Sequence, residues 1–146
     1  MARATITLPE KFLFSTKISV RITDLNYGGH LGNDSVLSLI HEARVRFLAH
    51  YGFSEQDVEG RGIIMADSVI VYKSQAFYGD LLSIEITAND FSKNACDLVY
   101  LLSNTGTGKE VARAKTRIAF YDYSERKTVP VPEKFREIFM GRDNTE

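Results

Sequence analysis

Apolar and polar residues alternate along the first patterned stretch of this chain, residues 17–24 (KISVRITD). The alternation places Ile18, Val20 and Ile22 on one face, which predicts a half-buried strand. The residues that follow, 24–34 (DLNYGGHLGND), are polar and rich in glycine. We therefore expect the strand to end in a loop.

The longest apolar pattern begins after this loop and has the period of a helix. It starts at Asn33 or Asp34 and continues to about Tyr51, and Gly52 lies just beyond it as a stop. The apolar positions cover more than one stripe: Val36, Leu37, Leu39, Ile40, Ala43, Val45, Phe47 and Leu48. We therefore expect the helix to be largely enclosed.

Almost all of the remaining chain has the pattern of strands. Strands are predicted over 63–72, 82–88, 97–102 and 111–121, with the sequence NTGTGK as a hairpin turn before the last one, and a short helix over 133–140. Successive strands joined by short turns pair antiparallel, and one long apolar helix can bury itself only against one face of such a sheet. The sequence predicts an α+β fold with a curved sheet wrapped on a helix, in one domain spanning residues 1–146.

Composition and charge limit the classes of function. The 146 residues are 44% hydrophobic and 25% charged, as in an ordinary globular domain. A formal net charge of -1 without a run of Lys or Arg argues against a nucleic-acid partner. The lone Cys96 cannot form an internal disulfide, and no apolar run approaches the roughly 20 residues of a membrane span. With no apolar leader after Met1, we expect a cytoplasmic protein without a membrane span.

Two patterns suggest chemistry that their spacing does not support. Residues 103–110 (SNTGTGKE) contain Gly-Lys, but a phosphate-binding loop needs Gly at Ser103 and Ser or Thr at Glu110. His41 and His50 are nine residues apart on the predicted helix, not at the spacing of four that brings two metal ligands together. We therefore expect neither a metal site nor a cofactor, and a structural or surface role for both histidines.

Three cations lie on one face of the last long strand. Arg113, Lys115 and Arg117 alternate there with small and apolar residues. The structural interpretation is a solvated sheet face. The functional alternative is a docking surface for an anionic group such as a phosphate, because parallel side chains concentrate positive charge.

The backbone of the loop before the helix is suited to bind a ligand. Gly28, Gly29 and Gly32 permit a tight turn and a close approach of the main chain. The helix that begins near Asn33 directs unpaired N–H groups and the positive end of its dipole into this loop. Such a helix start stabilises negative charge that develops on a carbonyl oxygen.

Three side chains flank this helix start. Asp24, Asn26 and His30 are candidates to hold a water molecule or to transfer a proton. The structural alternative is a loop in which Asn33 or Asp34 only caps the helix and the glycines only turn the chain.

A resemblance to a known family begins at this loop. Residues 20–48 (VRITDLNYGGHLGNDSVLSLIHEARVRFL) resemble the signature of the hot-dog-fold thioesterases, the group that contains 4-hydroxybenzoyl-CoA thioesterase and bacterial acyl-CoA thioesterases. That signature consists of Val-Arg, Asp-x-Asp, small residues, Gly-His, a pair of Asn and a helix with Glu-Ala-Arg. Residues 69–85 (VIVYKSQAFYGDLLSIE) resemble the second strand, the Gly-Asp turn and the third strand, and KTVPVPEKF resembles the tail. The resemblance spans nearly the whole domain.

The resemblance implies a fold, a reaction and a partner. Such proteins wrap a sheet around a central helix and pair two sheets edge to edge in a homodimer, often in a dimer of dimers. They hydrolyse an acyl-CoA or acyl carrier protein thioester to a free acid and a thiol. The amide matching Asn33 polarises the thioester carbonyl, and a carboxylate in the preceding loop attacks the carbonyl or activates water. The substrate would lie against Gly28 and Gly29, with Tyr27, Phe77 and Tyr78 as apolar walls for the acyl group.

One position departs from the family signature. The second acid of Asp-x-Asp is Asn26 here, and an amide can orient water but cannot act as nucleophile or base. Asp24 stands two residues earlier, roughly 6–7 Å away on the same face of a strand. Glu42 lies roughly 13 Å from Asn33 along the helix, so it would have to come from a partner subunit. The structural alternative for Glu42 is an ion pair with Arg46, four residues on.

The leading hypothesis is therefore an acyl-CoA thioesterase. In it His30 and Asn26 position water, the amide of Asn33 binds the oxyanion, and Asp24 or Glu42 supplies the base. The alternative is a protein that binds acyl thioesters without hydrolysing them, which Asn26 favours. A third hypothesis is a dehydratase or another hot-dog enzyme, which would need a histidine and an acid placed to remove an α-proton.

Overall fold

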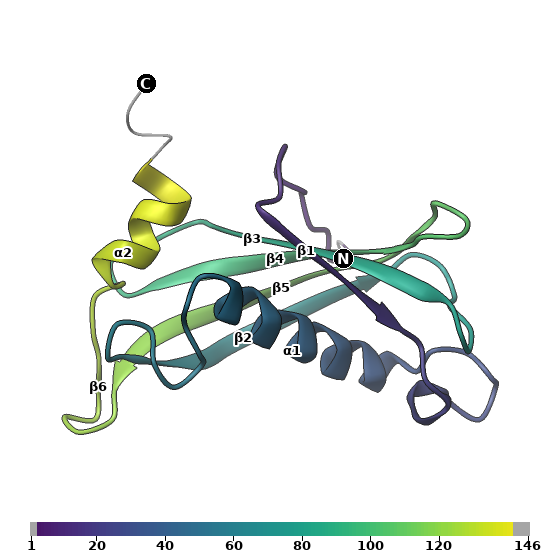
Figure 1. Ribbon diagram of the computed structural model, residues 1–146, viewed down its shortest axis with the longest axis horizontal. Coiled ribbons are helices and arrows are strands. Elements are labelled where there is room, and N and C mark those ends of the chain that lie inside the picture. Colours follow the sequence, from purple (N-terminus) through teal and green to yellow (C-terminus); the bar gives the residue numbers. More distant parts are fainter. Residues whose placement is uncertain (1–2, 142–146) are drawn as a thin grey trace.

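The computed structural model describes residues 3–141. Met1, where an apolar leader would start, lies outside the described residues. The strands are β1 (Phe14–Ser19), β2 (Gly62–Tyr72), β3 (Leu81–Asn89), β4 (Ala95–Asn104), β5 (Glu110–Asp122) and β6 (Lys127–Thr128). The helical elements are a 3-10 turn (Ile22–Asp24), α1 (Asn33–His50), and α2 (Glu133–Arg136) continued by a π-helical turn (Glu137–Gly141) (Figure 1). None of the described helices is long and apolar enough to cross a membrane.

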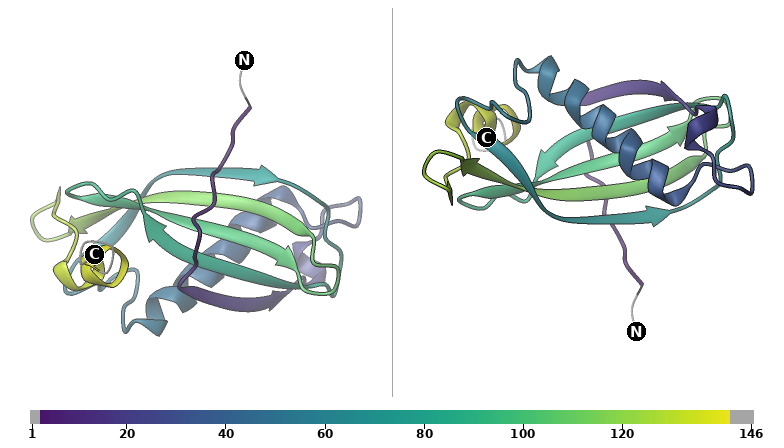
Figure 2. Two further views of the ribbon diagram at one scale, coloured as in Figure 1. Left: turned by 90° about the horizontal axis from the view of Figure 1, so that it is seen from above. Right: turned by 90° about the horizontal axis from the view of Figure 1, so that it is seen from below.

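Helix α1 lies on the concave face of the sheet, and the N-terminal segment crosses the opposite face (Figure 2). The predicted α+β architecture, a curved sheet around one helix, is thus confirmed. The helix contains no glycine or proline, and Gly52 follows it with a φ of 83°, a left-handed conformation that glycine adopts without strain. The buried face of α1 comprises Val36, Leu39, Ile40, Ala43, Phe47 and Leu48, and the strands oppose it with Leu82, Ile84, Ile86, Leu98, Leu102, Ala112, Ala114, Ile118 and Phe120.

The sheet order is β1-β3-β4-β5-β2, with all pairs antiparallel. The expected pairing of successive strands holds for β3 with β4 and for β4 with β5. It is wrong for β2, which pairs with β5 at the far edge. The connection 73–80 is not a tight turn, because it crosses to the loop before α1, where Leu31 donates to Ala76 (2.8 Å) and Gly79 to Val20 (2.9 Å).

The first strand is shorter than the alternation predicts. β1 begins at Phe14 and ends at Ser19, and Ile22, expected on the buried face, is 67% exposed. A 3-10 turn replaces the end of the predicted strand, because the Asp24 carboxylate accepts the amide of Arg21 (2.8 Å) and bends the chain there.

Helix α1 is less enclosed than its apolar pattern predicts. Leu37 and Val45 are 46% and 45% exposed, and with His41 they follow one line along the helix at a spacing of four. The helix begins beside the end of the edge strand β2, where the Tyr72 hydroxyl donates to the carbonyl of Asn33 (3.3 Å). The helix therefore carries an exposed apolar stripe, and within the described residues the strand β2 has no neighbouring strand on its outer side.

A buried cation ties the middle of α1 to the sheet. The Arg44 guanidinium donates to Glu55 (2.7 Å) and to the Tyr100 hydroxyl (3.2 Å), which is itself bonded to Thr116 (2.8 Å). His41 also bonds Glu55 (3.0 Å), as expected of a structural histidine. These bonds satisfy polar groups that would otherwise be costly to bury.

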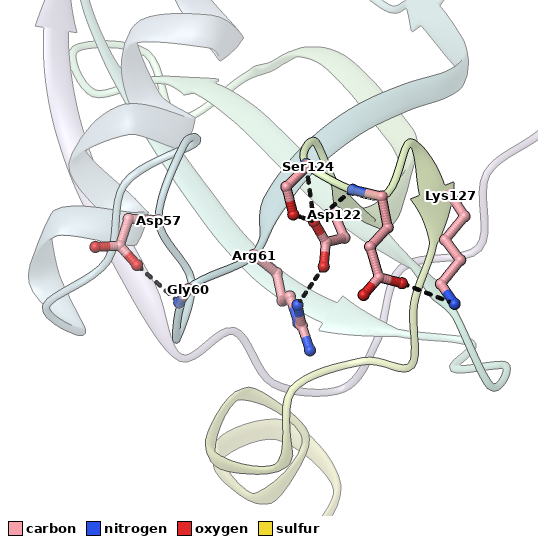
Figure 3. A network of polar contacts seen from close by, with 7 residues as sticks. Asp57, Gly60, Arg61, Asp122, Ser124 and Lys127 are labelled. Carbon is pink, nitrogen blue, oxygen red and sulfur yellow. Dashed lines mark hydrogen bonds and ion pairs between the residues drawn. The ribbon is translucent and has the colours of Figure 1, made fainter.

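A second polar network holds the end of the molecule remote from the start of α1 (Figure 3). Arg61, just before β2, forms an ion pair with Asp122 at the end of β5 (2.9 Å). Asp122 also accepts the amide and hydroxyl of Ser124 (2.9 and 2.7 Å). Hydrogen bonds to its charged form lower the pKa of Asp122, those from Ser124 most strongly.

The packing of α1 predicts where truncation is costly. Phe47→Ala removes a ring that is 0% exposed, and we expect the free energy of unfolding to fall by about 3–5 kcal/mol. Tyr27→Ala, the matched control at a fully exposed aromatic, should change it by less than about 0.5 kcal/mol. Denaturant unfolding measures both, and equal losses would contradict this description of the core.

Candidate active site

The loop between β1 and α1 is closed by its own backbone. Gly32 donates to the carbonyl of Asp24 (2.9 Å), and Asn26 donates to that of His30 (2.8 Å). Leu31 is bonded to the 73–80 connection, so the loop is also attached to the sheet. The loop therefore presents its side chains from a fixed frame.

The Asn26 side chain organises the turn. Its Oδ1 accepts the amides of Gly28 (2.9 Å) and His30 (3.2 Å). Gly29 has a φ of 82°, a left-handed conformation that other residues rarely adopt, so glycine is required there. The amide group of Asn26 thus holds His30 in place.

The start of α1 leaves one backbone donor free. The amides of Ser35 and Val36 donate to Gly32 (3.1 and 3.2 Å), and that of Asp34 donates to Oδ1 of Asn33 (2.9 Å). The amide of Asn33 has no acceptor among the residues that the structure describes. It combines a free N–H with the positive end of the helix dipole.

A cleft of about 530 Å³ opens at this helix start. It brings together three predicted site residues, Asn26, His30 and Asn33. It is also lined by Leu31 and by a segment that sequence reasoning missed: Tyr72, Lys73, Ser74 and Gln75. No local motif marks this segment, which reaches the cleft only because β2 ends beside α1. None of the lining residues is a carboxylate.

The predicted apolar walls do not enclose this cleft. Tyr27 is fully exposed, Tyr78 is 65% exposed, and neither lines it. Phe77 contacts it only through His30, whose ring meets the Phe77 ring edge-on at 5.2 Å. In the described chain, these three aromatics are exposed and do not line the cleft.

Asp24 is held as a structural carboxylate. It is 3% exposed and accepts the amide of Arg21 (2.8 Å) and its guanidinium (3.2 and 3.1 Å). Burial raises the pKa of the Asp24 carboxyl, but the hydrogen bonds and charge of Arg21 outweigh it, so the pKa lies below its ordinary value. A buried, paired carboxylate of lowered pKa is a poor base, so the geometry does not support the predicted role of Asp24.

Glu42 points away from the cleft. The expected ion pair with Arg46 is confirmed (2.9 Å), and Arg46 also donates to Thr16 (2.9 Å) and Lys17 (3.1 Å) of β1. Glu42 therefore lies on the side of α1 that faces β1.

The cations of β5 are likewise remote from the cleft. Ala112 and Ala114 face α1, so Arg113, Lys115 and Arg117 lie on the outer face of the sheet. Each has an acidic neighbour there: Arg113 pairs with Glu110 (2.6 Å), and Lys115 and Arg117 pair with Asp97 (4.0 and 3.1 Å). The structure does not bring these residues to the candidate site.

A curved antiparallel sheet around one helix, with a free amide at the helix start, defines a protein of the hot-dog class. The sequence profile of the family described as the thioesterase-like superfamily matches residues 20–139. The chain belongs to this family. No curated protein sequence matches it at a significant level.

Solved structures share the fold at low sequence identity. A 1,4-dihydroxy-2-naphthoyl-CoA thioesterase from Synechocystis, Slr0204, superposes with a TM-score of 0.79 at 23% identity, covering 89% of this chain and 97% of that one. The DHNA-CoA thioesterase from Staphylococcus aureus gives 0.71 at 17% identity, covering 90% and 85%. The protein SAV2348 from the same organism, solved in complex with CoA, gives 0.76 at 15% identity, covering 90% and 83%. At these identities the likeness shows the hot-dog fold.

The structural role of Asp24 predicts a pH-dependent loss of stability. Because its pKa is lower in the folded chain than in the unfolded one, the carboxylate stabilises the fold above about pH 4 and ceases to do so as the pH falls through the folded pKa. We expect Asp24→Asn to lower the free energy of unfolding by about 1–2 kcal/mol at pH 7. Denaturant titrations between pH 7 and 3 should show the two proteins converging in acid. A variant of full stability that had lost turnover would instead make Asp24 the base.

Proposed function

We propose that this protein hydrolyses acyl thioesters of coenzyme A. The observation that carries the proposal is the unpaired amide of Asn33, a residue that lines the same cleft as His30 and Asn26. Membership of the thioesterase-like family supports it, as do the thioesterases among the structural relatives. A cytoplasmic location, where acyl-CoA is formed and used, is part of the proposal.

The cleft supports one arrangement of the reaction. The thioester carbonyl oxygen accepts the amide of Asn33, which stabilises the negative charge that develops on it. Asn26 and His30 hold a water molecule beside the carbonyl carbon. The His30 imidazole takes a proton as the water oxygen forms the new C–O bond.

Collapse of this intermediate releases both products. The carbonyl re-forms, the C–S bond breaks, and the thiolate of coenzyme A takes the proton from the imidazolium of His30. The other product is the free acid. We assign the base to His30 rather than to Asp24 or Glu42, because it is the imidazole in the cleft while both carboxylates are paired with arginines elsewhere.

A homodimer is the second part of the proposal. Strand β2 is an edge of eleven residues, and a long unpaired edge readily pairs with another chain. Met65 and Tyr72 on this strand are exposed, as are Leu37 and Val45 on α1. A second copy that paired along β2 would cover this surface and close the open side of the cleft, with the acyl group between the two chains. Two such dimers would make the dimer of dimers common in the family.

The alternative is a protein that binds acyl thioesters and does not hydrolyse them. The cleft favours it in one respect, since none of its lining residues is a carboxylate and the usual acid is Asn26. An acyl carrier protein in place of coenzyme A would present the same thioester to the same amide.

The free amide is tested by removing only its hydrogen. Asn33→Pro deletes the N–H at the first helical position, where proline is well tolerated, and Gly32 already has the extended conformation (φ -70°, ψ 148°) that precedes proline. We expect kcat to fall by about 10²-fold or more, as for loss of an oxyanion donor. Asn33→Ala, which keeps the N–H, is the matched control. Release of free thiol from short-, medium- and long-chain and benzoyl-type CoA thioesters measures turnover.

The same panel separates the enzyme from the binder. For an enzyme, the natural protein turns over at least one thioester, and His30→Gln loses about 10²-fold or more. If the natural protein is silent and Asn26→Asp is active, the chain is a binder derived from an enzyme. Equal rates for Asn33→Pro and Asn33→Ala would remove the amide from the mechanism.

The proposed dimer interface predicts that one substitution on α1 converts the dimer to a monomer. Leu37→Glu places a charge on the exposed apolar stripe of α1, where it adds no buried charge to the monomer. We expect sedimentation velocity to show a dimer for the natural protein and a monomer for this variant. Leu81→Glu, the same change at a leucine 38% exposed beyond that stripe, should remain a dimer. A dimer for both variants would place the interface elsewhere.

A further inference from the structure

A second hollow adjoins the cleft at the same end of the molecule. It has a volume of about 220 Å³ and shares Ser74 and Gln75 with the cleft, so the two adjoin there and are together called the groove. The loops that form the groove, 73–80 and 104–109, lie together at the end where α1 begins (Figure 1). The remaining lining residues of the hollow are Phe77, Asp80, Asn104, Thr107 and Lys109.

The groove carries two cations that form no ion pair among the described residues, although the pKa of Glu110 is lowered by its hydrogen bond with Arg113 and also by the charge of Lys73. Lys73 lines the cleft and Lys109 lines the hollow. Neither has an ion-pair partner within residues 3–141, whereas the nearby Glu110 is committed to Arg113 (2.6 Å). Asp80, the carboxylate of the hollow, accepts the amide of Phe77 (2.9 Å). Two exposed, unpaired ammonium groups along one groove are suited to a ligand with several phosphates.

An exposed aromatic ring lines the hollow together with Lys109. Phe77 is 48% exposed, and its ring packs against His30 in a T-shaped arrangement with the ring centroids 5.2 Å apart. An exposed ring held in this way offers a stacking surface for a nucleobase, which binds through its π-face.

The hairpin that presents Lys109 is rigid. Oδ1 of Asn104 accepts the amides of Gly106 (2.8 Å) and Thr107 (3.2 Å), and Gly108 has a φ of 75°. As the spacing of NTGTGK indicated, this is not the motif in which a glycine-rich backbone before a helix cradles a phosphate, since strand β5 follows it rather than a helix. Its contribution is instead a lysine held at the rim of the hollow.

From these contacts we propose that the hollow binds the nucleotide end of coenzyme A. The phosphates lie between Lys73 and Lys109, the adenine stacks on Phe77, and the pantetheine arm crosses Ser74 and Gln75 into the cleft. This inference rests on the proposed function and refines it, because a carrier-protein thioester has the pantetheine arm but no adenine.

Binding is tested without any reaction. Adenosine 3′,5′-bisphosphate is titrated calorimetrically into the full chain at low ionic strength, where charge attraction is least screened. We expect binding to the natural protein and about fivefold weaker binding to Lys109→Gln. Lys127→Gln, at the opposite end of the molecule beside the Asp122 network, is the matched control and should bind as the natural protein does (Figure 3). No binding to the natural protein, or an equal effect of both variants, would overturn the proposal.

Kinetics then separate the nucleotide from the rest of the substrate. With octanoyl-CoA, Lys109→Gln should raise KM about fivefold at unchanged kcat, since the lysine is remote from the reacting atoms. With octanoyl-pantetheine, which lacks the nucleotide, the same variant should match the natural protein. Equal KM increases for both substrates, or an increase confined to a carrier-protein thioester, would contradict a nucleotide site. If the natural protein hydrolyses neither octanoyl-CoA nor octanoyl-pantetheine, the proposed function fails. The calorimetric titration still decides whether the hollow binds the nucleotide.

Discussion

Burial of α1 against the concave face of the sheet is the interaction on which the rest of this structure depends. Ala43, Phe47 and Leu48 are all 0% exposed, and each fully buried large side chain contributes about 1.5–3 kcal/mol. The sheet closes over this one helix, so the direction of α1 sets the position of everything attached to its ends. The free amide at its first residue is held in place by hydrophobic packing several turns away.

The loop before α1 holds the candidate catalytic groups beside the start of the packed helix. Its backbone bonds to itself and to the 73–80 connection, while Asn26 holds the amide of His30. The acidic residue of the loop, Asp24, turns inward and forms an ion pair with Arg21. Glu42 on the helix forms an ion pair with Arg46. The cleft is therefore left with an imidazole, an amide side chain and a helix-start N–H. This set of groups makes His30 the centre of the proposed chemistry.

On some parts of the surface the charged groups have partners, and on other parts apolar and charged groups have none among the described residues. On the outer face of the sheet the cations of β5 have acidic neighbours, and the Arg113 guanidinium also donates to the carbonyl of Ile6 (2.9 Å) in the N-terminal segment. Along α1 and β2, apolar side chains and a strand edge have no neighbour among residues 3–141. In the cleft and the adjoining hollow, Lys73 and Lys109 form no ion pair within the described part of the chain. These unsatisfied regions are the ones for which we propose a second chain and a nucleotide.

Much of this protein was determined by the sequence itself. Several features follow from periods and spacings within short segments, because they depend on neighbours along the chain. They are the helix over 33–50, its stop at Gly52, strands β2 to β5 within one or two residues of most ends, and the grouping of Asn26, His30 and Asn33. The position of β2 at the far edge, the arrival of Tyr72–Gln75 at the cleft and the exposure of Leu37 do not follow from any local pattern. They depend on which apolar faces meet across the sheet. Likewise, only the tertiary structure decided that Asp24 and Glu42 form ion pairs with arginines. The same sequence spacing suits a catalytic base and an ion pair, because the surrounding chain determines which way each carboxylate points.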